Sequence, residues 1–172
     1  MKYTACFTGH RPQSLPCRFN EQHPACLKIK YQLRRLIAGL IEKKNVTHFI
    51  SGAAIGIDTW AAEIVLELQA EYPDITLEAA IPCRSQADRW TKAAKERYNR
   101  LISLCDKVTL ISEQYTADCM MKRNRYMVDN SDYVIAVWNG KPIGTGNTVK
   151  YAMEEGKEIY CVNTIMFNIS RV

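Results

Sequence analysis

The sequence predicts a single-domain, Rossmann-like α/β fold with a doubly wound, mostly parallel sheet and helices on both faces. Short apolar runs alternate with amphipathic segments along the whole chain, which is the pattern of strand and helix units in a parallel sheet. With 172 residues, of which 47% are apolar, the chain can bury one sizeable core. We therefore expect one domain over residues 1–172, without a linker or an internal repeat.

The N-terminal part begins with an expected strand over residues 3–8 and a turn, Gly9-His10-Arg11-Pro12. A loop rich in Pro, Asn and Gln extends to about residue 24. Apolar residues then recur at steps of three and four over residues 33–41, which predicts a buried helix face. The apolar run over residues 46–51 predicts the second strand.

The middle of the chain repeats this order. We expect a helix through residues 61–68 that stops before Pro73, then a third strand over residues 75–81 closed by Pro82. Ser85 is expected to cap the following helix, whose apolar side includes Trp90, Ala94, Tyr98, Leu101 and Cys105.

The C-terminal part supplies the remaining elements. We expect a fourth strand over residues 107–111 and a helix from residue 116 or 117 to about residue 130. A fifth strand is expected over residues 133–138. A glycine-rich turn over residues 139–147 should lead into a helix over residues 148–155, and the sixth strand should cover residues 158–162.

One stretch, residues 49–63, has the strongest functional pattern. An apolar strand passes through a turn with Gly52 and Gly56 into a helix with Asp58 in its first turn. Glycine allows the backbone to approach a bound group, and a helix N-terminus offers free N–H donors that suit phosphate. The spacing is neither that of the dinucleotide-binding fingerprint nor that of the P-loop. The stretch predicts a phosphate-bearing small ligand.

Other unusual loops also follow predicted strands: residues 9–11, 82–84, 112–114 and 140–147. In a parallel sheet these loops meet at the carboxyl edge, where ligands of such folds bind. We therefore expect the ligand site at this edge.

Composition narrows the classes of partner and compartment. The net charge is +5, but no run of five basic residues occurs, which favours a nucleotide over an extended nucleic-acid surface. The seven cysteines form no C-x-x-C pair and the three histidines do not fall at ligand spacing, so no metal site is expected. Without a signal peptide or an apolar run of about 18 residues, we expect a cytoplasmic protein.

At this point the motifs resemble those of a known family. Phe7-Thr8-Gly9-His10-Arg11-Pro12, followed by Ser51-Gly52-Ala53-Ala54-x-Gly56-x-Asp58-x-Trp60-Ala61-Ala62-Glu63, is similar to the YpsA-like proteins of bacteria, a family of unknown function. They belong to the SLOG superfamily, which joins DNA-processing protein A (Smf/DprA) with the Lonely-guy nucleotide hydrolases. The resemblance extends from Tyr3 to Val162.

The two better-known branches imply different activities. The DprA-like segments are Ser51-Gly52-x-Ala54-x-Gly56-Ile57-Asp58 and Arg123-Asn124-Arg125, and that branch binds single-stranded DNA. Met120-x-x-Arg123-x-x-x-Met127 is similar to the Lonely-guy arginine motif. That arginine works with a glutamate after a glycine-threonine turn, and Thr148 stands at the expected glutamate position.

The threonine at the glutamate position affects whether the protein can hydrolyse a nucleotide. Cleavage of an N-glycosidic bond develops positive charge on the sugar, which a carboxylate stabilises and a threonine cannot. The candidates for catalysis are Arg123, Glu113 and Asp58, with Glu63 as a further substitute carboxylate, and binding without turnover remains open.

The residues expected to bind a ligand come from the strand-end turns and from the arginine motif. The alternatives are helix capping for Asp58 and Asn147, surface ion pairs for the arginines and packing for His10. Trp90, Trp138 and Tyr115 could stack on a base, although Trp90 is better explained as a core residue. The predicted ligand-binding set is Thr8, Gly9, His10, Arg11, Ser51, Gly52, Ala53, Gly56, Asp58, Arg123, Gly144, Thr145, Asn147 and Thr148.

The leading hypothesis is a protein that binds, senses or slowly processes a nucleotide or a nucleotide derivative, with NAD or ADP-ribose suggested by the resemblance. No cofactor is expected with certainty, and a homodimer fits base rates. The alternatives are single-stranded DNA binding, which would need a basic groove with stacking aromatic residues, and nucleotide N-glycosidic hydrolysis. Basic residues that could begin such a groove are Lys122, Arg123, Arg125 and Lys141. Three acidic residues reduce its positive charge: Asp118, Asp129 and Asp132.

Overall fold

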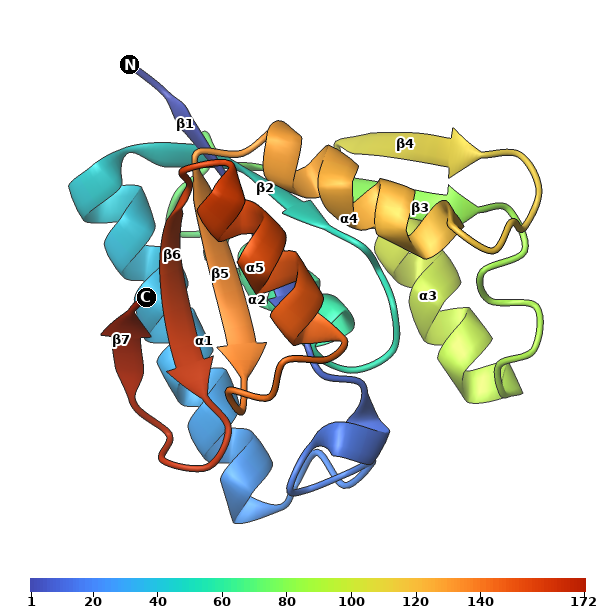
Figure 1. The fold of residues 1–172 in the computed structure, drawn as a ribbon, viewed down its shortest axis with the longest axis horizontal. Helices are drawn as coiled ribbons and strands as arrows, with labels where there is room; N and C mark the ends of the chain where they lie inside the picture. The colour runs from blue at the N-terminus through green and yellow to red at the C-terminus, as the bar shows by residue number, and fades with distance from the viewer.

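The computed structural model describes residues 1–172 as one α/β domain built on a seven-stranded sheet (Figure 1). The strand order is β4-β3-β2-β1-β5-β6-β7, and every pair is parallel except β6 with β7. The predicted fold class is confirmed. The strands are β1 (Tyr3–Gly9), β2 (Val46–Ser51), β3 (Thr76–Cys83), β4 (Lys107–Ser112), β5 (Tyr133–Trp138), β6 (Glu158–Asn163) and β7 (Ile169–Arg171).

Five α-helices cover the two faces of the sheet. One face packs against α1 and α2, with α3 beside α2, and the other packs against α4 and α5 (Figure 1). None of these helices combines the length and the apolar character needed to span a membrane. The helices are α1 (Pro24–Lys44), α2 (Ile57–Leu68), α3 (Lys92–Leu104), α4 (Cys119–Asp129) and α5 (Thr145–Glu154), and a 3-10 turn, η1, covers Pro12–Ser14.

The core is divided between the two faces. The larger apolar cluster lies between the sheet and the helices α1 and α2, where the stacked rings of Phe7 and Phe49 lie 5.9 Å apart. The smaller cluster lies under α4 and α5 and contains Met127, Val134 and Val149. Since central strands are buried on both sides, their side chains are apolar at successive positions, as in the buried run Ala5-Cys6-Phe7 of β1.

The strand order determines where a ligand can bind. The chain moves from β1 to β2 on one side of the sheet and later enters β5 on the other side of β1. The carboxyl ends of β1 and β5 therefore form the topological switch point, where open α/β sheets leave a crevice. The loops after β1, β2 and β5 lie nearest to it.

Several element boundaries differ from the sequence-based predictions. Residues 84–90 form turns, and Thr91 caps α3 by accepting a hydrogen bond from the Ala94 N–H at 3.2 Å, so the predicted Ser85 cap is wrong. Pro82 lies inside β3 and does not close it. The last helix begins at Thr145, three residues earlier than predicted, and α4 begins at Cys119.

The short strand β7 was not predicted. It has three residues, none buried, and joins the sheet only by antiparallel pairing with β6. Three residues are too few to show an alternation of apolar and polar side chains, so this strand can be recognised only from its pairing with β6.

One carboxylate is buried in the sheet. Glu78 of β3 is 2% exposed and accepts hydrogen bonds from Thr109 and Tyr126, each at 2.6 Å, while His48 Nε2 lies 2.7 Å from its other oxygen. Burial alone would raise the pKa of Glu78, but these hydrogen bonds and the charge of Lys107 outweigh it and hold the pKa at about 2. The group is therefore charged in the folded protein.

Candidate functional site

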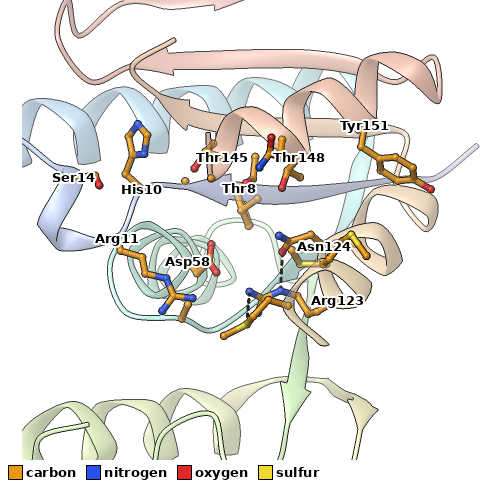
Figure 2. Close-up of a pocket in the computed structure, with 18 of the residues that line it drawn as sticks. Thr8, His10, Arg11, Ser14, Asp58, Arg123, Asn124, Thr145, Thr148 and Tyr151 are labelled. Atoms are coloured by element: carbon orange, nitrogen blue, oxygen red, sulfur yellow. Dashed lines mark hydrogen bonds between the residues drawn. The ribbon is translucent and has the colours of Figure 1, made fainter. Parts of the chain in front are cut away.

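A cavity of about 730 Å³ opens at the switch point. Its walls come from the turn after β1, the turn that enters α2, one side of α4 and the first turns of α5 (Figure 2). The volume falls within the range of small-molecule sites, roughly 300–1,000 Å³. Of the residues predicted to bind a ligand, those that line the cavity are Thr8, Gly9, His10, Arg11, Asp58, Arg123, Gly144, Thr145, Asn147 and Thr148.

Two buried charges flank Gly52. Asp58 at the start of α2 is 8% exposed, and Arg123 of α4 is 4% exposed. A Cβ atom at Gly52 would lie 2.3 Å from Nη1 of Arg123 and 2.7 Å from Oδ2 of Asp58. Gly52 does not itself line the cavity, but the absence of a side chain at this position lets the two charged groups occupy the same region.

The Arg123 guanidinium is held by a backbone carbonyl oxygen and by a side-chain amide. Its Nη1 donates to the carbonyl oxygen of Gly52 at 2.7 Å, and its Nε donates to Oδ1 of Asn124 at 2.9 Å. The contact of Nη2 is to Met120 Sδ at 3.8 Å, and sulfur is a weak acceptor. This leaves Nη2 with donor capacity for a ligand.

Burial and the neighbouring charges have opposite effects on the pKa values of Asp58 and Arg123. Burial raises the pKa of the Asp58 carboxyl, while the positive charges of Arg123 and Arg11 favour its ionised form. Burial also lowers the pKa of the Arg123 guanidinium, which the charge of Asp58 opposes. Each group thus stabilises the charged state of the other in a region that excludes most water.

Hydrogen bonds within the turn fix the start of α2. Ser51 Oγ donates to the carbonyl oxygen of Asp58 at 2.7 Å, and Thr59 Oγ1 donates to that of Ala54 at 2.7 Å. Ala53 adopts a left-handed backbone with φ of 54°. Ser51 and Ala53 are buried and do not line the cavity, so the structure gives them a supporting position beneath the site.

Two predicted glycines allow the loops to pack together. A Cβ atom at Gly9 would lie 2.4 Å from the side chain of Ile57, so Gly9 permits the close approach of α2 to β1. Gly56 has φ of 97°, and a Cβ atom there would lie 2.9 Å from the carbonyl oxygen of His10. Gly56 lines a second cavity, described below, and not this one.

His10 lines the cavity but already has a partner. Its Nε2 accepts a hydrogen bond from the Asn139 N–H at 3.0 Å, and Figure 2 shows the ring pointing away from Asp58. Burial lowers the pKa of His10, which favours the neutral ring. The imidazole therefore joins the loops after β1 and β5, which agrees with the packing alternative for this residue.

Several polar side chains of the cavity have no partner within the chain. Arg11 is exposed and forms no ion pair within the chain, while the hydroxyl groups of Thr8, Thr145 and Thr148 are not used in internal hydrogen bonds. Figure 2 shows Arg11, Asp58 and Arg123 along one side and Thr145 and Thr148 along the other. A ligand bound between these sides would contact charged side chains on one side and threonine hydroxyl groups on the other.

The start of α5 differs from the predicted turn. Gly144, with φ of 56°, is the N-cap residue, and Thr145, Asn147 and Thr148 all lie in the first turns of the helix. Asn147 is exposed in the first turn, so it does not cap the helix. The helix N-terminus faces the cavity and adds a partial positive charge.

Sequence reasoning missed several residues that line the cavity. Most of them lie on α4 or in the 3-10 turn, and the others lie in β1, in the turn before α2 and in α5. For α4 the available signal was the helical spacing of Met120, Arg123, Asn124 and Met127. Arg125 lies over the Tyr151 ring at 5.1 Å. The missed lining residues are Phe7, Gln13, Ser14, Ala54, Ile55, Met120, Met121, Asn124, Arg125, Met127 and Tyr151.

The other candidate carboxylates lie elsewhere. Glu113 does not line the cavity, and its exposed side chain pairs with Arg84. The loop after β4 is separated from β1 by β3 and β2, which places Glu113 away from the switch point. Glu63 accepts a hydrogen bond from Arg97 and does not line the cavity. Of the candidate carboxylates, Asp58 is the one that lines it.

The aromatic candidates also lie outside it. Trp138 Nε1 donates to the carbonyl oxygen of Lys141 at 2.8 Å, and Tyr115 is 69% exposed. Trp90 is only partly buried and packs edge-on against Tyr98 at 5.3 Å, so the core position predicted for Trp90 is wrong. It is the last residue of the turns at 84–90 and precedes α3, so it is not part of the helix face that packs against the core.

Comparison with curated proteins finds uncharacterised bacterial relatives. A prophage-derived protein of Bacillus subtilis strain 168, YoqJ, is 32% identical over 143 residues, which cover 76% of this chain and 84% of that protein. A UPF0398 protein of Bacillus thuringiensis strain Al Hakam is 33% identical over 153 residues, which cover 88% of this chain and 80% of that protein.

Solved structures share the fold at low sequence identity. DNA processing protein A of Streptococcus pneumoniae has a TM-score of 0.62 with 22% identity, over 92% of this chain and 50% of that chain. The Helicobacter pylori protein, described for its single-stranded DNA binding mode, has a TM-score of 0.61 with 16% identity, over 92% of this chain and 64% of that chain. The chain thus spans between half and two thirds of these proteins.

The match to a family model covers nearly the whole chain. The model of the YspA SLOG family matches residues 5–169 and includes both glycine-bearing turns and the arginine motif of α4. The family predicted from those motifs is confirmed. The chain belongs to the YpsA family of SLOG proteins.

Proposed function

We propose that the cavity binds the phosphate and ribose of a nucleotide or a nucleotide derivative. The observation that carries this proposal is the placement of Asp58 and Arg123 around Gly52, at the floor of a cavity whose mouth holds the unpaired Arg11. Arginine donors suit phosphate oxygens, and a buried carboxylate suits a sugar hydroxyl. Ligands of the NAD or ADP-ribose kind contain both groups.

The opposite wall supports the same ligand class. Thr145 and Thr148 offer hydroxyl groups, and the N-terminus of α5 favours a negative charge. Membership in the SLOG family and the shared fold of a single-stranded-DNA-binding protein also support nucleotide chemistry at this edge. Nothing in the proposal requires a metal ion or a second cofactor.

Single-stranded DNA binding is the weaker alternative. A continuous basic groove would be needed, but Lys122 pairs with Asp118, Arg84 pairs with Glu113, and Arg123 is buried. Hydrolysis of an N-glycosidic bond would rest on Asp58, because this is the acidic residue in the cavity. Release of free base from a bound nucleotide, lost in Asp58→Asn and kept in Glu113→Gln, is the assay for that activity.

Thermal unfolding against AMP, ADP-ribose, NAD, cyclic nucleotides and a short single-stranded oligonucleotide tests the proposal. A ligand at 100 times its dissociation constant adds about 2.7 kcal/mol, which corresponds to roughly 5–10 °C for a protein of this size. We expect a shift with at least one small nucleotide. We expect Arg11→Ala to remove the shift with only a small change in the stability of the free protein, because Arg11 is exposed and forms no ion pair.

Arg84→Ala is the matched control. Arg84 is also an exposed arginine that follows a strand, but it lies outside the cavity and pairs with Glu113. It should keep the full ligand-induced shift. Equal shifts in the wild type and in Arg11→Ala, or no shift with any small nucleotide, would contradict the proposal. A salt-sensitive shift with the oligonucleotide alone would favour the DNA-binding alternative.

A further inference from the structure

A second cavity, of about 440 Å³, lies on the other side of the turn that enters α2. It is enclosed by the segment after η1, the start of α2, the turns after β3 and the start of α3. Unlike the first cavity, it is rich in aromatic residues: Phe19, Trp60, Trp90 and Tyr98 line it. Aromatic faces of this kind stack on nucleobases without regard to sequence.

Two of these aromatic residues are available to a ligand. Phe19 is 66% exposed, so most of its ring can contact a ligand. Trp90 is partly buried, with its ring held edge-on to Tyr98 at 5.3 Å. Trp60 is already covered by Lys30, whose Nζ lies 4.9 Å from the ring centroid. Phe19 and Trp90 therefore provide the faces on which a flat group can stack.

The charges around this cavity suit an anion. Arg97 is neutralised, because it donates to Glu21 at 2.6 and 2.9 Å and to Glu63 at 3.0 Å. Arg18 and Arg89 also line the cavity, and neither forms an ion pair within the chain. The free charge at this cavity is therefore positive, which complements a phosphate.

The two cavities share a thin wall. Ile55 lines both of them, and Arg11 lines the first while its neighbour Pro12 lines the second. The wall is closely packed, because a Cβ atom at Gly56 would lie 2.9 Å from both His10 and Pro12. The Ile57 N–H also bonds the His10 carbonyl oxygen at 3.5 Å. A phosphate that joins groups in the two cavities would lie near the segment of Arg11 and Pro12, where the exposed Arg11 has no ion-pair partner.

We infer that the second cavity binds a second nucleoside, joined through phosphate to the nucleotide in the first cavity, with its base stacked on Trp90 and Phe19. This inference rests on the function proposed for the first cavity. The ligand class is then a dinucleotide unit. Such a unit has two sources, a small molecule with a 5′–5′ pyrophosphate and a single-stranded nucleic acid with a 3′–5′ phosphodiester.

The test measures the dissociation constants of three probes: AMP, diadenosine 5′,5′-diphosphate and the 3′–5′-linked dinucleotide pdApdA. We expect one of the two dinucleotides to bind the wild type about tenfold more tightly than AMP, which is the size of one base-stacking contact. If the 5′–5′-linked probe binds more tightly, the ligand is a small molecule, and if the 3′–5′-linked probe binds more tightly, the ligand is a single-stranded nucleic acid. Tryptophan emission should be quenched by that dinucleotide and not by AMP, because AMP fills only the first cavity.

Variants of the aromatic residues distinguish binding in the second cavity from binding in the first. Trp90→Ala and Phe19→Ala should reduce the advantage of the dinucleotide to less than about threefold while AMP affinity stays unchanged. Phe19 is largely exposed, so its variant keeps the test valid if Trp90→Ala does not fold. Trp90→Phe should keep the affinity, because phenylalanine also stacks, but lose most of the quenching. Trp138→Phe is the control, since Trp138 lines neither cavity.

The outcomes distinguish this inference from the proposed function. Tight binding of AMP that depends on Arg11, with no advantage for either dinucleotide, would overturn the second subsite and leave the first intact. An advantage that survives in both Trp90→Ala and Phe19→Ala would overturn it as well. A dinucleotide that binds through Trp90 while Arg11→Ala has no effect would overturn the function proposed for the first cavity.

Discussion

The carboxylate of Asp58 and the guanidinium of Arg123 lie on either side of Gly52, and a side chain at that position would meet both. The two residues are 65 positions apart in the sequence and come from helices on opposite faces of the sheet. They are brought together at Gly52, which follows β2, because α2 begins after this turn and Arg123 of α4 donates to the Gly52 carbonyl oxygen. The site therefore depends on the backbone of one glycine as much as on the two charges.

Gly52→Ala should impair both folding and ligand binding. The new Cβ atom would lie 2.3 Å from Nη1 and 2.6 Å from Cζ of Arg123, so the guanidinium must leave the Gly52 carbonyl oxygen. We expect a loss of about 1–3 kcal/mol in urea unfolding, as for other overpacked sites. Gly39→Ala in α1 is the control, with no atom within 4 Å, and should stabilise the protein by about 0.5–1 kcal/mol. Equal stability of Gly52→Ala and wild type would contradict the packing at this turn.

Asp58 and Arg123 should be energetically coupled. Arg123→Met leaves the Asp58 carboxyl buried without its main counter-charge, which we expect to cost about 3 kcal/mol. Asp58→Asn removes that uncompensated charge, so the double variant should be less destabilised than the sum of the single variants. A double-mutant cycle from denaturant unfolding measures the difference. Strict additivity would show that the two charges do not interact.

The stability of the protein should fall in acid through Glu78. The pKa of this carboxyl is about 2 in the folded protein, against an ordinary value of 4.5. Its contribution, about 3 kcal/mol, is fully present above about pH 4.5 and is lost as the pH falls from there toward 2. Glu78→Gln should therefore unfold with a flatter pH dependence in this window.

Glu154→Gln is the control for that experiment, because Glu154 is exposed at the end of α5 and forms no ion pair. It should retain the wild-type pH profile. A wild-type profile in Glu78→Gln as well would show that the network of His48, Thr109 and Tyr126 does not stabilise the charged carboxyl.

Thr91 should stabilise α3, and Ser85 should not. Thr91 accepts the Ala94 N–H at 3.2 Å, so Thr91→Ala should cost about 1 kcal/mol and lower the melting temperature by roughly 2–4 °C. Ser85 lies in the turn before the helix, where it caps nothing. Ser85→Ala should change the melting temperature by less than half as much. A larger decrease in melting temperature for Ser85→Ala than for Thr91→Ala would indicate that Ser85 caps the helix, as predicted from the sequence.

The positions of most elements could be predicted from local patterns. The strands β1, β2, β4, β5 and β6 agree with the predicted ranges to within one residue, because each is a short apolar run bounded by turn residues. The start of α3 could not be predicted in the same way. Ser85 and Thr91 both precede residues that fit a helix, and only the path of the turns decides which of them is the cap.

Much of the site could also be predicted, because parallel strands bring their carboxyl ends to one edge. Thr8 ends a predicted strand, while Arg11, Asp58 and Thr145 follow predicted strands, and all four line the cavity. Glu113 also follows a strand, but the strand order places β4 at the far edge of the sheet. Strand order depends on long-range pairing, which a local pattern does not contain.

The sequence by itself determined the fold class, the family and the turns that bear the site, since these depend on periodicity and on motifs within short segments. Only the tertiary structure decided which turns meet, that Arg123 turns toward the Gly52 carbonyl oxygen and that Trp90 lines a second cavity. The physical reason is distance: hydrogen bonds, burial and charge act over a few ångströms in space. Residues 71 positions apart, such as Gly52 and Arg123, come within that range only when the sheet has formed.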